Sequence, residues 1–281
     1  MPLSTEDVLP AVAPRPGKRR PGRELAASSF QALAGPLVTV LHRLRVPPPA
    51  VVVVHTAVGL AAALAIGAGS LVAGALLLQL KTLLDGADGQ LARASGQVTA
   101  LGRYLDTEAD FLVNAAVFGA LAVATGAPWL ALAAFCALTL VLSADFNVAA
   151  LHLEARGTPE PPPRATGRIV EQALARAYAM VFGPQDRLVR AVSGARLRRI
   201  LADERDPGIR ERVSRAYHDD ATATIIANVG LSTQYLVLGV CLALDRPEVY
   251  LWLVVGSLAL LPALQLRREL VARRALSQPG S

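Results

Sequence analysis

Residues 71–110, LVAGALLLQLKTLLDGADGQLARASGQVTALGRYLDTEAD, join one apolar run to the next through a segment that carries five carboxylates. Apolar residues dominate on both sides, over residues 50–84 and again over residues 111–124. Carboxylates beside membrane-length apolar runs are costly, and they persist where they face a cavity, a partner or an ion. This stretch therefore predicts two membrane helices whose acidic ends meet at one point.

The composition of the whole chain favours a membrane protein. Apolar residues make up 53% of the 281 residues and charged residues only 18%, whereas a soluble domain carries about 25% charged residues. The net charge is +6, but the basic residues fall between apolar runs, which is typical of membrane topology and predicts no nucleic-acid partner. Cys136 and Cys241 lie within apolar runs and are interpreted as buried hydrophobic residues.

We predict an all-α integral membrane protein with six transmembrane helices and an N-terminal interfacial amphipathic helix. About 20 residues cross the hydrocarbon core, and glycines at positions 67 and 69 divide the first long run. Residues 28–46 contain Pro36 and basic side chains, which suits a helix along the membrane surface. The six spans are expected at residues 50–67, 71–92, 102–124, 129–153, 222–244 and 249–266.

These spans divide the chain into four parts. They are a basic flexible tail (1–27), the interfacial helix with four spans and the acidic motif (28–156), a polar excursion (157–221), and two spans with a basic tail (222–281). The excursion is expected to hold amphipathic helices around residues 167–182 and 207–219. Of the 28 basic residues only Arg246 falls on the opposite side. This asymmetry places both termini and the excursion in the cytoplasm of a multi-pass protein of the cell membrane.

Helical spacing puts the acidic side chains on shared faces. At about 100° per residue, one face at the end of the second span carries Asp85, Asp88, Gly89, Ala92 and Arg93. The third span begins with Gly102, Asp106 and Asp110 at intervals of four residues. The linker around Gly96 is short enough to bring the two faces together, and four converging carboxylates need one or two divalent cations. An arginine for phosphate and small residues for close approach complete a phosphoryl-transfer site.

The same positions resemble the motif D-x2-D-G-x2-A-R-x8-G-x3-D-x3-D of the CDP-alcohol phosphotransferases. Every fixed position and both spacings match, over a resemblance that covers about residues 30–155. It implies six transmembrane helices, an active site open to the cytoplasm, often a homodimer, and Mg²⁺ or Mn²⁺, as two ions. By resemblance Asp85, Asp88 and Asp106 are metal ligands, and Asp110 is a metal neighbour that also serves as the general base. Residues implied to border the CDP moiety are Gly89, Ala92 and Gly102, with Arg93 near the diphosphate.

Some positions depart from the family pattern. Many members have P-N-x-x-T at the start of the first span, where residues 49–53 here read PAVVV, with His55 and Thr56 out of register. No histidine metal site is predicted, because the four histidines lie far apart in the sequence. Asp145 and Arg156 are tentative residues for the acceptor headgroup. A polar helix end facing headgroups and water explains Arg156 equally well, whereas Asp145 lies deeper.

The resemblance implies a membrane enzyme of phospholipid synthesis. Such an enzyme transfers the phosphatidyl group of CDP-diacylglycerol to a small hydrophilic alcohol, such as glycerol phosphate, inositol phosphate or serine, and releases CMP. Asp110 would take the proton of the attacking hydroxyl. The motif equally allows transfer of phosphocholine or phosphoethanolamine from a CDP-alcohol to diacylglycerol. A cation transporter and an inactive lipid-binding relative are further alternatives, although clustering of the aspartates at one membrane face disfavours a transport path.

Overall fold

The computed structural model describes residues 24–159, 164–167 and 169–278. In these residues the fold is all-α, as predicted, with a single isolated bridge between Thr99 and Arg164. The helices are α1 (Leu25–Arg43), α2 (Pro48–Gly67), α3 (Leu71–Ala94), α4 (Ala100–Thr125), α5 (Pro128–Ala155), α6 (Ile169–Val181), α7 (Gly183–Ile200), α8 (Pro207–Tyr217), α9 (Asp220–Ala227), α10 (Leu231–Ala243), α11 (Pro247–Ser257) and α12 (Leu260–Ser277).

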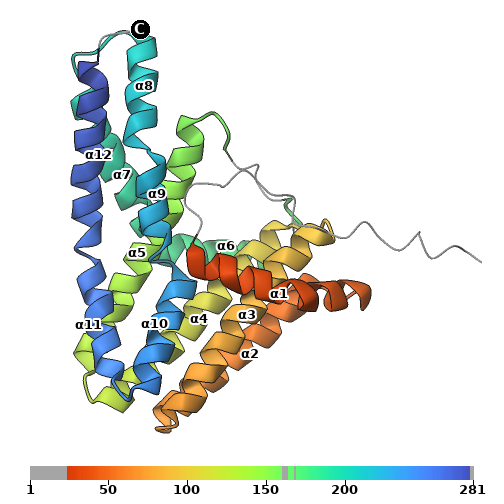
Figure 1. Cartoon of the computed structure of the whole chain (residues 1–281). Coiled ribbons are helices and arrows are strands. Elements are labelled where there is room, and N and C mark those ends of the chain that lie inside the picture. The colour runs from red at the N-terminus through yellow and green to blue at the C-terminus, as the bar shows by residue number, and fades with distance from the viewer. Residues whose placement is uncertain (1–23, 160–163, 168, 279–281) are drawn as a thin grey trace, which may run out of the picture.

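Six helices share one hydrophobic core; α2, α3, α4 and α5 coincide with the first four predicted spans, and α10 and α11 cover parts of the fifth and sixth. Buried residues of α2, α3, α4, α5, α10 and α11 form a single cluster, and Figure 1 shows α2, α3 and α4 side by side. Most members of the cluster are Ala, Val and Leu. Small side chains such as alanine let membrane helices approach closely. Close van der Waals packing then holds the helices together, because lipid provides no hydrophobic driving force between them.

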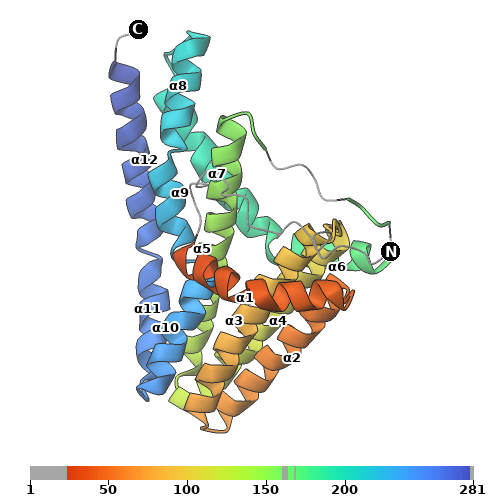
Figure 2. The same cartoon turned by 45° about the vertical axis from the view of Figure 1, so that its right-hand side comes forward.

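By length and composition, six helical segments of the described residues can cross a membrane, but they are not the same six. They include α1 and omit α3, which carries the charged residues Lys81, Asp85 and Asp88. Helix α1 lies crosswise to the bundle (Figures 1 and 2), and only 6% of its apolar window is buried. Helix α3 packs between α2 and α10 inside the bundle. This arrangement agrees with an interfacial α1 and a membrane-embedded α3.

The sequence between α3 and α4 sets the turn that faces their acidic ends toward each other. Gly96 follows the end of α3 with a φ of 67°, a left-handed conformation that glycine adopts without steric cost. Thr99 then caps α4, because its Oγ1 accepts a hydrogen bond from the Gly102 amide at 3.1 Å. The chain therefore reverses between Ala94 and Ala100, as the short linker predicts.

The predicted fifth span is broken into α9 and α10, which corrects the sequence analysis. Gly230 precedes α10 and has no side chain to cap it. The Glu24 carboxylate fills that role by accepting a hydrogen bond from the Thr233 amide in the first turn of α10. Nearby, the Leu25 amide donates to Asn228 Oδ1 at 3.1 Å. The start of α1 is thus attached at the break between α9 and α10.

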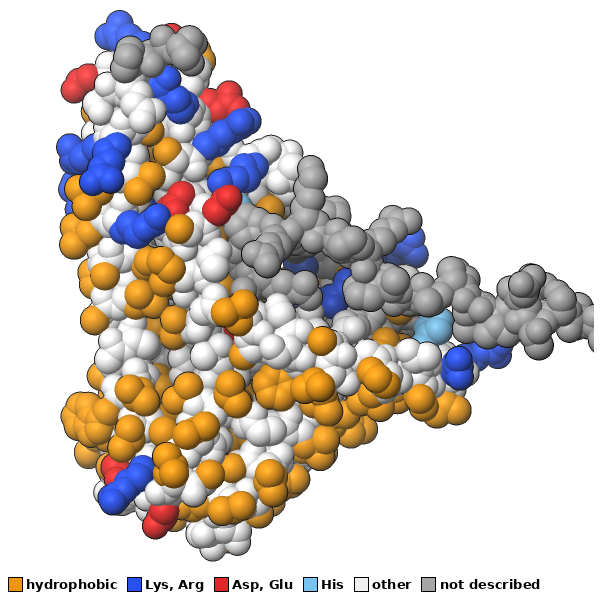
Figure 3. All heavy atoms as spheres, in the orientation of Figure 1, with side chains coloured by type: hydrophobic (Ala, Val, Ile, Leu, Met, Phe, Trp, Pro, Cys, Tyr) orange, Lys and Arg blue, Asp and Glu red, His pale blue; other side chains and the backbone are white. Residues whose placement is uncertain are grey.

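The predicted sixth span and basic tail also differ from the structure. Helix α12 continues to Ser277, so the predicted tail is helical. Its Arg268 is buried and donates to the Tyr217 carbonyl, Ser193 Oγ and His218 Nδ1, at 2.7–3.0 Å. Helices α7, α8 and α12 share a small core of their own. The described residues of the excursion form three helices, α6, α7 and α8, rather than the two predicted. Figure 3 shows basic side chains gathered over the upper part of the molecule and hydrophobic ones below.

Candidate metal centre

Helices α2, α3 and α4 bring a histidine and three aspartates to one point. The Nε2 atom of His55 lies 3.0 Å from Asp88 Oδ2. The same nitrogen lies 3.7 Å from Asp106 Oδ1 and 3.8 Å from Asp85 Oδ1. One ligand atom from each of the four residues lies within 4.8 Å of the others. Ligands bound to one ion at about 2.1 Å stand about 3–4 Å apart, so the spacing fits a single cation.

His55 corrects the prediction that no histidine takes part in a metal site. Distance along the chain was the reason for excluding it, but α2 packs against both α3 and α4. Its side chain is fully buried, on a helix that is otherwise almost entirely apolar. Because a buried polar group needs a partner, a lone histidine in an apolar span already indicates a polar cluster nearby.

Asp110 lies one turn further along α4 and pairs with a lysine. Lys81 Nζ donates a hydrogen bond to Asp110 Oδ1 and a second, at 2.8 Å, to Asp85 Oδ1. The Lys81 side chain is 1% exposed, and its ammonium lies 5.5 Å from the ring centroid of Tyr235 on α10. Asp110 is not part of the group that converges on His55. Asp88 and Asp106 thus lie next to the histidine, Asp110 pairs with the lysine, and Asp85 lies near both.

The small residues of the motif lie near the end of α3 and at the start of α4, next to the turn that joins these helices. A Cβ atom on Gly89 would lie 3.4 Å from Arg93 Nη1, so the guanidinium lies over this glycine. A Cβ on Gly102 would lie 3.3 Å from the Thr99 hydroxyl. Ala92 is half-buried and Arg93 is exposed. This arrangement leaves the end of α3 with little side-chain bulk beside one exposed cation.

The donor set fits a divalent metal ion. Asp106 Oδ1 is buried and has no hydrogen-bond partner among the described residues. The carboxylates of Asp85, Asp88 and Asp106 are oxygen ligands, which Mg²⁺ and Mn²⁺ prefer. Lys81 contacts only Asp85 and Asp110 among the four clustered aspartates, so its single positive charge leaves the cluster with excess negative charge. A bound cation would remove that repulsion.

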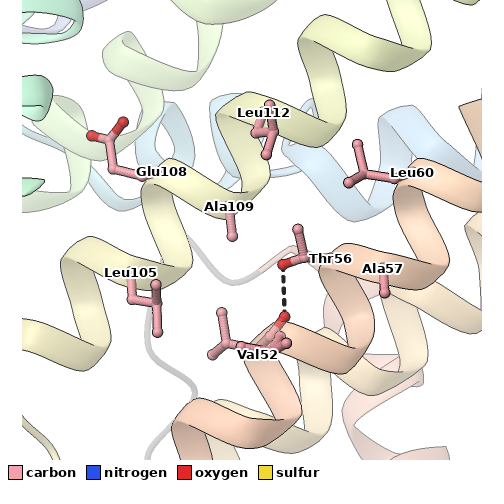
Figure 4. Close-up of a pocket in the computed structure, with 9 residues that line it drawn as sticks. Val52, Thr56, Ala57, Leu60, Leu105, Glu108, Ala109 and Leu112 are labelled. Atoms are coloured by element: carbon pink, nitrogen blue, oxygen red, sulfur yellow. Dashed lines mark hydrogen bonds between the residues drawn. The ribbon is translucent and has the colours of Figure 1, made fainter.

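An apolar groove lies between α2 and α4 (Figure 4), with a volume of about 420 Å³, and it is lined by Thr56, Leu105 and Ala109, which adjoin cluster residues in the sequence. The Thr56 hydroxyl donates to the Val52 carbonyl at 2.6 Å, so it leaves mostly hydrocarbon surface toward the groove. In Figure 4 the carboxylate of Glu108 points away from Thr56 and Leu112. Val53 and Leu112, on the lining, are 62% and 51% exposed. The groove therefore opens on the outer surface of the bundle.

Comparison with known proteins agrees with this geometry. Residues 37–194 match the family model described as CDP-alcohol phosphatidyltransferase. The match covers more than half of the chain and includes the whole cluster from His55 to Asp110. The chain belongs to the CDP-alcohol phosphatidyltransferase family. Its relatives are transferases of phosphate-containing groups.

Two curated relatives carry the name phosphatidylinositol phosphate synthase. The protein from Mycobacterium marinum is 35% identical over 98 residues, which are 34% of this chain and 42% of the relative. The protein from Mycobacteroides abscessus is 34% identical over 98 residues, 34% of this chain and 44% of the relative. The chain thus spans less than half the length of the curated relatives it matches. No solved structure matches it.

The two tentative acceptor residues of this CDP-alcohol phosphatidyltransferase lie outside the converging ligand group. Arg156 Nη2 donates to Asp220 Oδ1 at 2.6 Å, and Nη1 donates to the His218 carbonyl at 2.8 Å. These bonds join the end of α5 to the turn between α8 and α9, which favours a structural role. Asp145 is half-buried on α5 and interacts electrostatically with Glu24. An acceptor role for either residue stays a prediction.

Proposed function

We propose that this chain transfers the phosphatidyl group of CDP-diacylglycerol to a small hydrophilic alcohol and releases CMP. The observation that carries the proposal is that α2 and α4 contribute both to the carboxylate cluster and, through residues next to His55 and Asp106 in the sequence, to an apolar groove on the outside of the bundle. A diphosphate requires the charged site, because its negative charge must be neutralised. A diacylglycerol moiety requires hydrocarbon surface in contact with the bilayer. CDP-diacylglycerol contains both parts in one molecule.

For the acceptor we propose inositol phosphate. The name of both curated relatives describes a product in which a phosphatidyl group is joined to inositol phosphate. Formation of such a product by phosphatidyl transfer requires a phosphorylated polyol as the attacking alcohol. Glycerol phosphate and serine are the other small alcohols that the same reaction could use.

The residues divide the reaction between them. The acceptor oxygen forms a bond to the phosphorus atom that carries the diacylglycerol, and the bond from that phosphorus to the CMP oxygen breaks. Asp110 receives the proton of the acceptor hydroxyl, and Arg93 pairs with diphosphate oxygens. Gly89, Ala92 and Gly102 leave room for the cytidine nucleotide. Mg²⁺ or Mn²⁺ bound by the cluster would neutralise the diphosphate and make CMP a better leaving group.

The proposed orientation places this site at the cytoplasmic face of the cell membrane. Basic residues gather on the part of the molecule that contains α7, α8 and α12 (Figure 3), and such residues favour the cytoplasmic side. Both termini would then be cytoplasmic. A homodimer, expected from the family resemblance, stays a prediction.

The proposal is tested by measuring CMP release from the purified full-length chain in nanodiscs with Mg²⁺. CDP-diacylglycerol is paired with inositol phosphate, glycerol phosphate or serine, and CDP-choline with diacylglycerol. We expect CMP from CDP-diacylglycerol with inositol phosphate. In Asp110→Asn the rate should fall by at least about 10²–10⁴-fold, the contribution of general base catalysis.

The matched control is Asp245→Asn, in the turn between α10 and α11. Asp245 has a φ of 56°, a conformation that asparagine also tolerates, so this variant should keep full activity. Release of CMP only with CDP-choline and diacylglycerol would support the rival transfer. No release from any pair, or full activity in Asp110→Asn, would contradict the proposal.

A further inference from the structure

Lys81 is an unusual choice of residue in this chain. Of the 28 basic residues only Lys18 and Lys81 are lysines, and all others are arginines. Lysine is a compact point charge on a flexible stem, whereas arginine is a broad planar group. The Lys81 side chain is 1% exposed and lies within a long apolar run. A buried charge requires close partners, so this position specifically accommodates a small cation.

The partners of Lys81 come from three helices. Its ammonium contacts Asp85 Oδ1 on its own helix α3 and Asp110 Oδ1 on α4. The ring of Tyr235 on α10 covers it from a third direction, and the Tyr235 hydroxyl is held by Asn114 Oδ1 at 2.9 Å. The ammonium is therefore fixed between two motif aspartates by packing and by charge.

The Asp85 carboxylate connects this ammonium to the candidate metal position. Asp85 Oδ1 lies 2.8 Å from Lys81 Nζ and 3.8 Å from His55 Nε2. In sites with two metal ions the ions lie about 3.5–4 Å apart, a separation that one shared carboxylate can bridge. The Lys81 ammonium thus occupies the position between Asp85 and Asp110 where a second ion would have to bind.

We propose that the ammonium group of Lys81 replaces the second metal ion, so that this centre binds one divalent cation, beside His55. The inference rests on the proposed function and replaces the two ions that the family resemblance implies. Among the residues that the structure describes, only His55, Asp85, Asp88 and Asp106 converge on a common point. A further ion between Asp85 and Asp110 would meet the ammonium at close range, where like charges repel strongly.

A fixed ammonium differs from a metal ion because it cannot dissociate or be removed by chelators. It also holds Asp110 in one place through their hydrogen bond. Lys81 is therefore a positioning residue for Asp110 as well as a permanent positive charge. Depletion of divalent cations would empty only the position beside His55.

The test counts bound Mn²⁺ on the full-length chain in nanodiscs of phosphatidylcholine, after removal of metals by chelation. Electron paramagnetic resonance reports free Mn²⁺ during titration, and empty nanodiscs give the background. We expect one Mn²⁺ per wild-type chain. Lys81→Met removes the charge at similar length and should bind two Mn²⁺, with spectral broadening from coupling between them. Lys81→Arg keeps the charge and should bind one.

Two Mn²⁺ ions on the wild-type chain would overturn the inference, and this count does not depend on whether any variant folds. One Mn²⁺ ion on a folded Lys81→Met chain, or two on Lys81→Arg, would also overturn the inference. In either case the charge of residue 81 would not determine the number of bound ions. CMP release is measured on the same wild-type sample. Two ions with normal CMP release refute only the role of Lys81, whereas one ion without CMP release refutes only the proposed function.

Discussion

His55 acquires its role from neighbours that are distant in the sequence. Its Nε2 atom faces three aspartates from α3 and α4, and its Nδ1 atom is buried without a hydrogen-bond partner among the described residues. The candidate metal centre therefore includes one nitrogen atom from α2 beside the carboxylates of α3 and α4.

Replacement of His55 by alanine should weaken metal binding. Loss of groups that merely support metal ligands costs about 10–100-fold in affinity, so we expect the dissociation constant for Mn²⁺ to rise at least that much. Titration followed by electron paramagnetic resonance measures this. His42→Ala, on the exposed side of α1, is the control and should leave the constant unchanged. Equal affinities in both variants would exclude His55 as a ligand.

The aspartates of the site could be predicted from the sequence because their spacing follows the helical repeat. Intervals of three and four residues determine a shared face within one element, whatever the tertiary structure. The pairing of Lys81 with Asp85 is also an i, i+4 contact, so it could be predicted from helical spacing in the same way. His55 was missed because its contacts join different helices, and no spacing along one helix reports them.

At the scale of elements, the packing of α2 on α4 determines the geometry of both the metal centre and the groove. The two helices are in tight contact at Gly59, one turn beyond His55. A Cβ atom there would lie 2.6 Å from Cγ1 of Val113 on α4, which is too close for real atoms. The absence of a side chain at this point lets the two helices meet.

Gly59→Ala should therefore push α2 away from α4. Overpacking of a core costs about 1–3 kcal/mol, and we expect a lower midpoint of thermal unfolding in detergent together with weaker Mn²⁺ binding. In the double variant, Val113→Ala should restore most of the thermal stability and of the Mn²⁺ affinity, because the effects of two substitutions in contact are coupled. Gly119→Ala has no heavy atom within 4 Å of the added Cβ and is the control. Additive effects of the two substitutions at Gly59 and Val113 would refute the proposed contact.

Element boundaries were predictable where local residues set them, and not elsewhere. Gly96 and Thr99 define the turn between α3 and α4 by their own conformations. The break before α10 depends on Glu24, which lies more than 200 positions earlier in the sequence. An apolar run alone predicts one continuous span there. Helix α7 was missed because its arginine-rich sequence shows no strong apolar face.

At the scale of the whole molecule, the distribution of charge predicts the orientation in the membrane. Arg246 lies at the start of α11, at the end of the bundle opposite to the basic helices α7, α8 and α12. The apolar runs predict the core of membrane helices, and the uneven distribution of basic residues between the connecting segments predicts the orientation. Helix α8 was predicted, but its packing with α7 and α12 into one block could not be, because that packing depends on contacts between distant residues, such as that of Arg268 with Ser193.

Cysteine labelling in intact cells tests this orientation. Cys136 and Cys241 are first replaced by alanine, and a single cysteine is then introduced as Arg246→Cys or Arg212→Cys. A membrane-impermeant maleimide should label the first variant from outside, and the second only after permeabilisation, because basic segments stay in the cytoplasm. The opposite pattern would place the metal centre on the outer face and refute the proposed localisation.

The groove between α2 and α4 opens sideways, with Val53 and Leu112 exposed at its edge. For a lipid substrate such an entrance makes encounter a two-dimensional search, in which the donor never leaves the bilayer. Turnover would then follow the mole fraction of donor among the surrounding lipids and not its amount per volume of solution. Dilution with inert lipid would slow the enzyme as effectively as removing substrate.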